Sequence, residues 1–426
     1  MRLLIAQVIE AQPPQHGVQH LAVECAEGED AGHEREAHAA PAEGGRPARA
    51  ASVRAVRYEA VRYEALAPLC EAGDRVLVNT TALDLGLGTG GVCFVVANLT
   101  AAERSGPVAF DDASDCGGDD TCGDTDGDAP ASAKRTSLSG HIIKLRYTPF
   151  QHEVLSVEED ASPHHEAMKH ACSLAGAPVV CCELHSQVPL VAAAVKHADP
   201  GARIVYCMTD EAALLAAFSR ILVRMRETGL LDACITCGQA FGGDLEAVNV
   251  YSGLLAAVAV GKADVVLCSQ GPGIVGTATR FGHGGLAQAQ ALNAVAVLDG
   301  VPIAPLRLSF ADARSRQRGV SHHTLTALGT ACLARALVPL PDDLLREQAT
   351  TAARQLEEAG ILDRHRLVDV PLPSEAIDLR GLKVTTMGRA QADDPAFFSA
   401  AFAAGMLAAR LAGGPADGPA GEKARA

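Results

Sequence analysis

From about residue 165 onward, the chain alternates between short apolar runs and longer segments with helical periodicity. Runs in which nearly every residue is apolar are typical of strands that are buried on both faces of a parallel sheet. They are APVVCCELHSQ, RIVYCMTDE, DACITCGQAFGGD, ADVVLCSQGPG and VPIAPLRLSFADAR. The helical segments cover about 187–198, 211–228, 245–260, 284–298, 321–337, 342–359 and 394–412. This alternation predicts a Rossmann-like, doubly wound parallel-sheet α/β domain over residues 151–413.

The first 150 residues carry a different pattern, in which short runs of β-branched or alternating apolar residues follow one another. These runs are RLLIAQVIEA, HLAVEC, RAVRYEAVRYEAL, DRVLVNTT and VCFVVANL. Strands without helices between them predict a β-rich barrel or sandwich domain over residues 1–150. Polar, Gly-rich stretches near 27–51 and 111–133 indicate mobile insertions, and residues 414–426 a disordered tail.

Composition narrows the class of protein. The 426 residues are 48% apolar, but only 4% are aromatic and none is Trp, so the core must consist mainly of Ala, Val and Leu. The net charge of −15, with no basic cluster, argues against a nucleic-acid partner. We expect no membrane partner, because no uninterrupted apolar segment reaches a spanning length. Thirteen cysteines without a secretory start indicate a reduced, cytoplasmic protein whose thiols are mostly buried.

Polar residues follow nearly every predicted strand. Because the carboxyl ends of parallel strands meet at one edge of a sheet, and ligands bind outside that edge, these residues predict a shared site. They are His185 to Gln187, Thr209 and Asp210, residues 236–244, residues 270–277, and Asp312 to Arg314.

The loop GPGIVGT after the fourth run is the first candidate for ligand binding. It matches the G-x-G-x-x-G spacing, but Pro272 has no N–H to offer a pyrophosphate, and Thr277 stands where a Walker loop has Lys. Neither an NAD nor an ATP signature is therefore satisfied. We expect either a backbone nest for an anion or a tight strand-to-helix turn. The predicted ligand-binding residues of this loop are Gly271, Gly273, Gly276 and Thr277.

The segment SFADARSRQRGVSHHT, residues 309–324, concentrates charged and titratable groups. Asp312, Arg314 and Arg318 are predicted to bind ligand, with the arginines clamping a carboxylate or phosphate. His322 and His323 are predicted catalytic acids or bases, with Asp210 and His185 as catalytic partners. The alternative is a solvated basic loop in which Ser321 caps the next helix.

Two further patterns have both a chemical and a structural interpretation. Asp244 and Glu246 could hold a divalent metal, or they could only complement the dipole at a helix start. Cys234 and Cys237 form a lone CxxC pair, for which burial is favoured over a redox role.

The chain also resembles an uncharacterised, largely actinobacterial family of bacterial proteins with a domain of unknown function. The resemblance rests on VLVNTTALDLGLGTGG, GHIIKLRYTPFQ, ELHSQ, MTDEAALLAAFSR, AFGGDLEAVNVYSGLLAA, GPGIVGTATRFG and SFADARSRQRGVSHHTLTALG. It spans nearly the whole chain except the two insertions and the tail. It implies no established activity, substrate or catalytic residue.

The residues favour a hydrolase or group transferase that acts on a small anionic or phosphorylated metabolite. The alternatives are a non-catalytic metabolite-binding or regulatory module that uses the same site, and a structural protein whose strand ends are only turns. A homo-oligomer is compatible with either activity.

Overall fold

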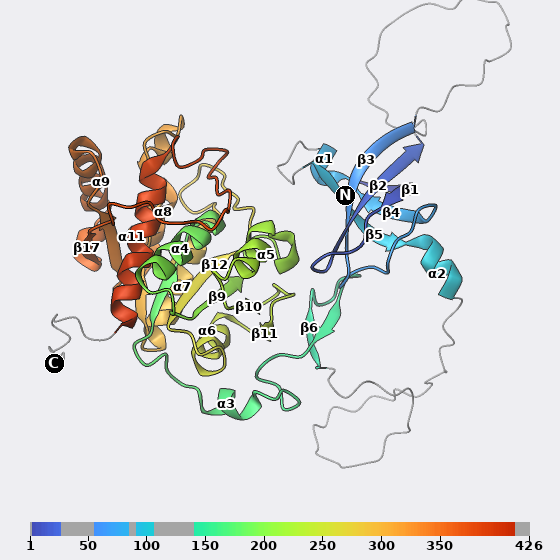
Figure 1. Ribbon diagram of the computed structural model, residues 1–426, viewed down its shortest axis with the longest axis horizontal. Coiled ribbons are helices and arrows are strands. Elements are labelled where there is room, and N and C mark those ends of the chain that lie inside the picture. Colours follow the sequence, from blue (N-terminus) through green and yellow to red (C-terminus); the bar gives the residue numbers. More distant parts are fainter. Residues whose placement is uncertain (1, 27–54, 85–90, 106–139, 414–426) are drawn as a thin grey trace, which may run out of the picture. The chain divides into compact units, whose positions relative to one another are not determined.

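The computed structural model describes residues 2–26, 55–84, 91–105 and 140–413 (Figure 1). The two predicted insertions and the predicted tail lie outside these ranges. The chain divides into two compact units, Met1–Ser132 and Ala133–Ala426.

The first unit is a closed five-stranded barrel with the strand order β1-β2-β3-β5-β4. Its strands are β1 (Leu3–Ala11), β2 (Val18–Ala26), β3 (Ala55–Tyr63), β4 (Arg75–Asn79) and β5 (Val92–Asn98), with short helices α1 (Thr81–Asp84) and α2 (Leu99–Ser105). Small apolar side chains such as Val23, Val76 and Cys93 fill the barrel. The tandem VRYEA repeat runs largely through β3, where its valine and tyrosine residues favour a strand. The predicted β-rich barrel fold of the N-terminal part is confirmed.

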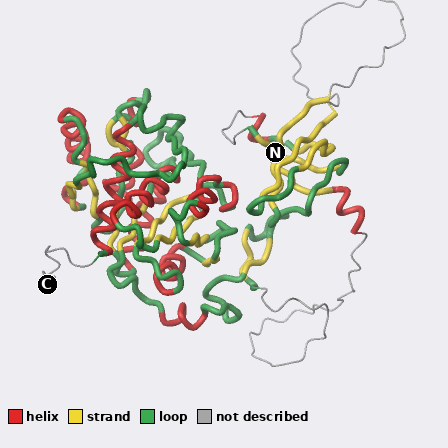
Figure 2. Tube along the Cα trace, viewed as in Figure 1, coloured by secondary structure: helices red, strands yellow, loops and turns green. Residues whose placement is uncertain are grey.

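The second unit is built on an eight-stranded, all-parallel sheet of order β11-β10-β9-β12-β8-β13-β16-β17, which confirms the Rossmann-like α/β fold (Figures 1 and 2). The strands are β8 (Pro178–Cys181), β9 (Ile204–Thr209), β10 (Ala233–Cys237), β11 (Leu245–Ala247), β12 (Val265–Gln270), β13 (Val301–Ile303), β16 (Leu337–Pro341) and β17 (Arg366–Val370). Two small ladders accompany it: the pair β6 (Ile142–Lys144) and β7 (His152–Val154), and the pair β14 (Leu308–Ser309) and β15 (Gly319–Val320).

Helices cover both faces of this sheet, and each face has its own hydrophobic core. One core contains side chains of α3 (His165–His170), α6 (Val250–Ala259), α7 (Ala287–Val297), α9 (Arg346–Glu358) and α10 (Ile361–Arg364). The other contains side chains of α4 (Val188–Ala198), α5 (Arg220–Glu227) and most of α11 (Pro395–Ala412). Figure 1 shows α4 and α11 side by side. Among the described residues, α11 alone is long and apolar enough to cross a membrane, and most of it is buried in this core.

Three predicted helices differ from the structure. The expected helix over 211–228 begins only at Arg220, as α5, after a 3₁₀ turn at Ala216–Phe218. The expected helix over 245–260 begins with β11, and α6 starts only at Val250. The expected helix over 321–337 is α8 (His322–Thr326) followed by a π-helical turn at Ala327–Ala331. It stops there because the Asn293 side chain accepts hydrogen bonds from the Leu333 and Ala334 N–H groups, and the apolar residues that follow enter β16.

The strand order reverses direction between β8 and β12. The connection from β8 through α4 passes β12 to reach β9, whereas the connection from β12 through α7 passes β8 to reach β13. These crossovers run in opposite directions and lie on opposite faces of the sheet. In open parallel sheets the ligand site lies beyond the carboxyl ends of the two strands at such a point.

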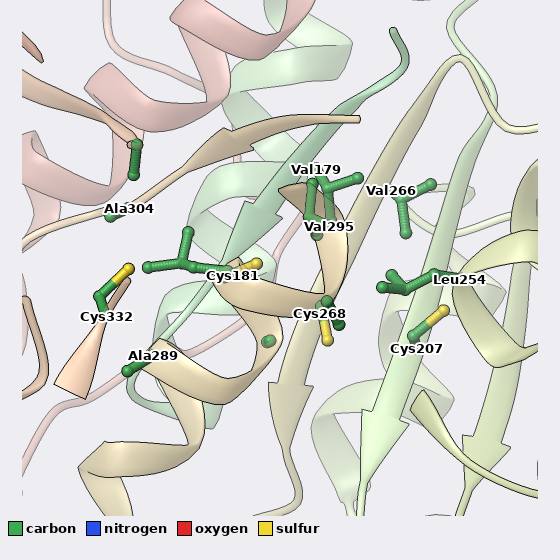
Figure 3. Close-up of a cluster of buried hydrophobic side chains, with 14 of the residues drawn as sticks. Val179, Cys181, Cys207, Leu254, Val266, Cys268, Ala289, Val295, Ala304 and Cys332 are labelled. Carbon is green, nitrogen blue, oxygen red and sulfur yellow. The ribbon is translucent and has the colours of Figure 1, made fainter. Parts of the chain in front are cut away.

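A row of buried thiols crosses the sheet just below this point, on the α6 and α7 face (Figure 3). Cys181 of β8, Cys268 of β12 and Cys207 of β9 are direct neighbours in the strand register. Burial first raises the pKa of Cys181 well above the ordinary value, whereas for Cys207 the hydrogen bond with Cys237 has the larger effect and burial adds to it, so both thiols stay protonated. They form an apolar layer under the carboxyl edge.

Candidate functional site

Polar side chains stand two residues after each cysteine of this row. Because side chains alternate along a strand, Glu183, Gln270 and Thr209 leave the sheet on the same face as Cys181, Cys268 and Cys207. Gln270 and Thr209 are register partners. The carboxyl edge at the reversal point therefore carries a polar row above a thiol layer.

Glu183 is the centre of the site, and its side chain is fully buried. Arg307 Nη1 donates to Glu183 Oε1 at 3.1 Å, and His323 Nδ1 lies 3.3 Å from the same oxygen. The Thr324 hydroxyl donates to the other oxygen, Oε2. Burial alone raises the pKa of Glu183, but the hydrogen bond with His323 and the charge of Arg307 outweigh it, so the net pKa is lowered and Glu183 is an anion.

This carboxylate orients the His323 ring. Ionised Glu183 can only accept, so its hydrogen bond with His323 requires a proton on Nδ1. Arg307 Nη1, 3.3 Å from that nitrogen, directs its hydrogen to the carboxylate at 3.1 Å instead. We therefore assign the proton to His323 Nδ1, which donates to Glu183, and a free lone pair to Nε2. The Cε1–Nε2 edge of the ring faces Gly276, where an added Cβ would lie 3.1 Å from both atoms.

Two more histidines pack against His323. The His283 ring stacks on it with centroids 4.0 Å apart and an interplanar angle of 5°, and the His322 ring meets it edge-on at 4.3 Å. Burial, followed by the effect of His323, lowers the pKa of His283 and brings that of His322 to about 4. The lowered pKa values favour the neutral form of both rings.

Local structure accounts for the position of these rings. His322 and His323 begin α8, where Ser321 accepts a hydrogen bond from the His323 N–H and caps the helix. The helix then passes into the π-helical turn, a distortion that is frequent at functional sites. His283 immediately precedes the turn that leads into α7, and its Nε2 lies 3.0 Å from the Arg280 carbonyl.

Several buried polar atoms at this edge have no hydrogen-bond partner among the described residues. In a folded protein such atoms are exceptions that call for an explanation, and a missing ligand or water is a frequent one. They are Thr209 Oγ1, Ser269 Oγ, Gln270 Oε1, His283 Nδ1 and His322 Nε2.

The glycine loop serves mainly to place the histidines. Gly273 has a φ of +102°, a conformation that favours glycine, and Gly271 lies against the Ala213 carbonyl with no room for a side chain. Gly276 and His283 pair as a short bridge, and the Thr277 N–H and hydroxyl both donate to Gly282 O. The Thr277 amide is therefore engaged within the loop, so anion binding by this loop stays a prediction.

The arginines of the segment 309–324 differ in whether their side chains form ion pairs within the described residues. Asp312 accepts hydrogen bonds from Arg314 and Arg389, and these contacts hold its pKa far below the usual value. Arg318 is exposed, and the hydrogen bonds assigned to it within the described residues involve only its backbone N–H and carbonyl. Arg316, also exposed, makes no ion pair within the described ranges, and its charge reaches His322. Arg316 and Arg318 are thus better placed than Arg314 to attract an anion.

The predicted catalytic partners lie outside this cluster. His185 Nε2 lies 2.6 Å from Ser219 Oγ and its Nδ1 3.2 Å from the Tyr206 hydroxyl, and all three side chains are buried. Burial lowers the pKa of His185 to about 4, which fits a neutral structural histidine. Asp210 accepts a hydrogen bond from the Gln239 N–H at the end of β10.

Asp244 and Glu246 are both bound to cationic side chains. Arg226 pairs with Asp244 at 2.5 Å. The buried Lys144 lies 3.2 Å from Glu246, whose pKa is raised because burial outweighs that pairing. Within the part of the chain that the structure describes, no group of three or more His, Cys, Asp or Glu side chains could hold a metal ion.

Three residues of the site were not predicted from the sequence: Glu183, His283 and Arg307. Gln270 belonged to the predicted strand end 270–277, but no role was assigned to its side chain. Glu183 lay in the predicted strand run that precedes His185, where a linear reading did not distinguish it from other polar residues. The recurrence of a polar residue two positions after a strand cysteine is a signal that could have done so.

Comparison with known proteins adds one match. A protein-family model, described as a protein of unknown function, matches residues 59–405, which include β8 to β17 and every residue of this site. No curated protein and no solved structure matches the chain.

Proposed function

The chain belongs to the family DUF3866, whose function is unknown, and we propose from its site that it is a hydrolase or group transferase acting on a small anionic or phosphorylated metabolite. The observation that carries the proposal is the contact of buried Glu183 with His323 at the reversal point of the sheet.

A carboxylate that holds the Nδ1–H of an imidazole leaves Nε2 as a general base with a fixed direction. In the hydrolytic form of the reaction, His323 Nε2 takes a proton from water while the water oxygen bonds to the phosphorus of the substrate ester. The bond from phosphorus to the leaving oxygen breaks, and that oxygen takes the proton back from the imidazolium. In group transfer, a second substrate's hydroxyl replaces the water.

The surroundings of His323 suit this role. Glu183 stabilises the imidazolium that forms, and Arg307 keeps Glu183 ionised in a buried position. The neutral His322 and His283 rings flank the base without adding positive charge at neutral pH. Exposed Arg316 and Arg318 supply cations for an anionic substrate.

Turnover of chromogenic esters by the full-length chain tests this proposal. The probes are p-nitrophenyl phosphate, bis(p-nitrophenyl) phosphate and p-nitrophenyl acetate. We expect hydrolysis of at least one phosphoester, and a loss of roughly 100-fold or more in kcat for His323→Gln, as for removal of a general base. Glu183→Gln should also shift the pH profile of kcat, which a purely structural role would not do.

The matched control is His170→Gln, because His170 is an exposed histidine on α3 and lies outside the cluster. It should keep the wild-type rate. A His323→Gln variant with wild-type turnover would contradict the assignment of the base. Phosphate binding without turnover of any ester would favour the alternative, a non-catalytic metabolite-binding or regulatory module.

We further propose a location in the bacterial cytoplasm. All cysteines of the described ranges are free, and all but Cys172 are buried, which suits a reducing compartment. The expected independence from nucleic acid and membrane, and the option of a homo-oligomer, stay predictions.

A further inference from the structure

Two of the unpartnered atoms belong to side chains on neighbouring strands. Thr209 ends β9 and Gln270 ends β12, and the two residues are register partners whose side chains leave the same face of the sheet. Their relative exposures are 7% and 1%. Neither Thr209 Oγ1 nor Gln270 Oε1 has a hydrogen-bond partner within the described ranges.

The orientation of the Gln270 amide is fixed by the protein. Its Nε2 donates to the Glu183 carbonyl at 3.1 Å and to the Gly284 carbonyl at 3.2 Å. A flipped amide would point its oxygen at two carbonyl oxygens, so this orientation is the one that the surroundings allow. Gln270 Oε1 is therefore an acceptor held in place, and an added Cβ on Gly284 would come within 3.0 Å of it.

The two atoms differ in the hydrogen bonds that they can form with a ligand. Gln270 Oε1 can only accept a hydrogen bond, whereas the Thr209 hydroxyl can donate one and accept one. An ionised oxyanion cannot donate to Gln270, and an ammonium can donate to both atoms but leaves the Thr209 hydroxyl hydrogen without an acceptor. A hydroxyl group can donate to Gln270 and accept from Thr209 with one oxygen atom.

We infer that Thr209 and Gln270 form a subsite for a hydroxyl group of the substrate, beside the Glu183–His323 pair. This inference rests on the proposed function and narrows its substrate to small hydroxylated anions. The hydroxylated part of the ligand binds at Thr209 and Gln270. Gln270 is next to Glu183, because its side-chain amide donates to the Glu183 carbonyl. The anionic group lies toward the exposed Arg316, whose charge reaches His322.

Calorimetric titration of the full chain with two probes tests the subsite. The probes are sn-glycerol 3-phosphate and n-propyl phosphate, which share the anion and differ in the hydroxyls. We expect the hydroxylated probe to bind wild type at least about tenfold more tightly, because hydrogen-bonding sites reject analogues that lack the partner group. In Thr209→Val that preference should fall below about threefold, while the affinity for propyl phosphate stays the same.

Thermal unfolding separates a binding role from a structural one. Because Thr209 Oγ1 bonds nothing in the described structure, Thr209→Val should leave the Tm unchanged or raise it. The matched control is Thr236→Val: this buried strand threonine donates to Glu246 at 2.8 Å, so its loss should lower the Tm and leave the hydroxyl preference intact.

Three outcomes would overturn the inference. One is equal binding of the two probes to wild type, or no binding of the hydroxylated one. Another is an unchanged preference of Thr209→Val for the hydroxylated probe, which would indicate that Thr209 Oγ1 and Gln270 Oε1 bind a structural water and not the ligand. The third is binding of O-phosphoethanolamine as tight as that of glycerol 3-phosphate, which would show recognition of any donor.

The same measurements keep this inference apart from the proposed catalysis. A hydroxyl preference without turnover of any ester would preserve the subsite and refute the enzyme. Turnover that depends on His323 without any hydroxyl preference would preserve the enzyme and refute the subsite.

Discussion

Glu183 shows what a buried charge requires at the scale of single residues. Its carboxylate is out of contact with solvent, and Arg307, His323 and Thr324 all face it. A buried ion is tolerated only when partners replace its hydration. The thiol layer below supplies no charge to replace the hydration of the carboxylate. Among the described residues, these three side chains therefore stabilise it.

Removing the cation should therefore destabilise the second unit. We expect Arg307→Met to lower the free energy of unfolding by about 3–5 kcal/mol, because it leaves a buried carboxylate without its counter-ion. Urea unfolding of the full chain, followed by circular dichroism, measures this change. The double variant Arg307→Met with Glu183→Met should recover much of the loss, since no buried charge then remains. Equal destabilisation in the single and double variants would argue against the pairing.

At the scale of elements, small residues decide how closely two helices approach. The α4 sequence VPLVAAAVKHA packs on the α11 sequence PAFFSAAFAAGMLAARLA. At their contact, Gly405 lies against the Val191 backbone carbonyl, and a Cβ there would overlap that oxygen. The helices can approach this closely because Gly405 has no side chain and Ala194 opposite it has a small one.

Enlarging Gly405 should force α11 away from α4. We expect Gly405→Val to lower the free energy of unfolding by about 1–3 kcal/mol or more, as overpacked cores do. Differential scanning calorimetry of the full chain measures it. Gly413→Val serves as a control, because Gly413 lies at the end of α11 and a Cβ added there would have its nearest neighbour, the Ala409 carbonyl oxygen, at 3.7 Å. A Gly405→Val chain as stable as that control would contradict the close contact.

The same scale shows which elements are predictable. The runs that became β8, β9, β10 and β12 are long, apolar and rich in β-branched residues, so each was recognisable without its neighbours. β11 (LEA) and β17 (RLVDV) were missed because polar residues interrupt them, so neither is a continuous apolar run. β16 was missed because it contains two prolines, which usually argue against a strand. Their pairing in the sheet decides their conformation.

For the whole molecule, buried histidines make stability depend on pH. Burial lowers the pKa of His185 to about 4, against about 6.5 in an unfolded chain. As the pH falls below 6.5 the unfolded chain takes up the proton first, so this contribution to stability is lost between about pH 6.5 and 4. The depressed pKa of Asp312 acts in the same direction at lower pH.

We expect the free energy of unfolding to fall by roughly 2 kcal/mol between pH 7.5 and pH 5 from His185 alone. Urea titrations at the two pH values measure it. His185→Gln should flatten the dependence by that amount, whatever its effect at pH 7.5, whereas the exposed-histidine variant His170→Gln should not. An unchanged slope in His185→Gln would mean that His185 is not held neutral by burial.

The candidate site was predictable only in part, for a physical reason. His322 and His323 were recognisable because they are two adjacent histidines after a predicted strand, and the GPGIVGT loop because glycines cluster there. Glu183, Arg307 and His283 come from three other segments of the chain, and each alone resembles an ordinary polar residue near a strand end. Arg314 was preferred to Arg316 because the sequence does not show that Arg314 pairs with Asp312, whereas Arg316 makes no ion pair within the described residues.

The amino-acid sequence by itself determined the fold class of each unit. Burial of an element on one or both faces sets a pattern of apolar and polar residues, and that pattern can be recognised without knowledge of the neighbouring elements. The sequence also determined that polar groups gather at strand ends. Only the tertiary structure decided that the chain reverses between β8 and β12, which sets Glu183 beside His323 and Gln270 beside Thr209. Strand order depends on contacts between segments far apart in the chain, and no local pattern records them.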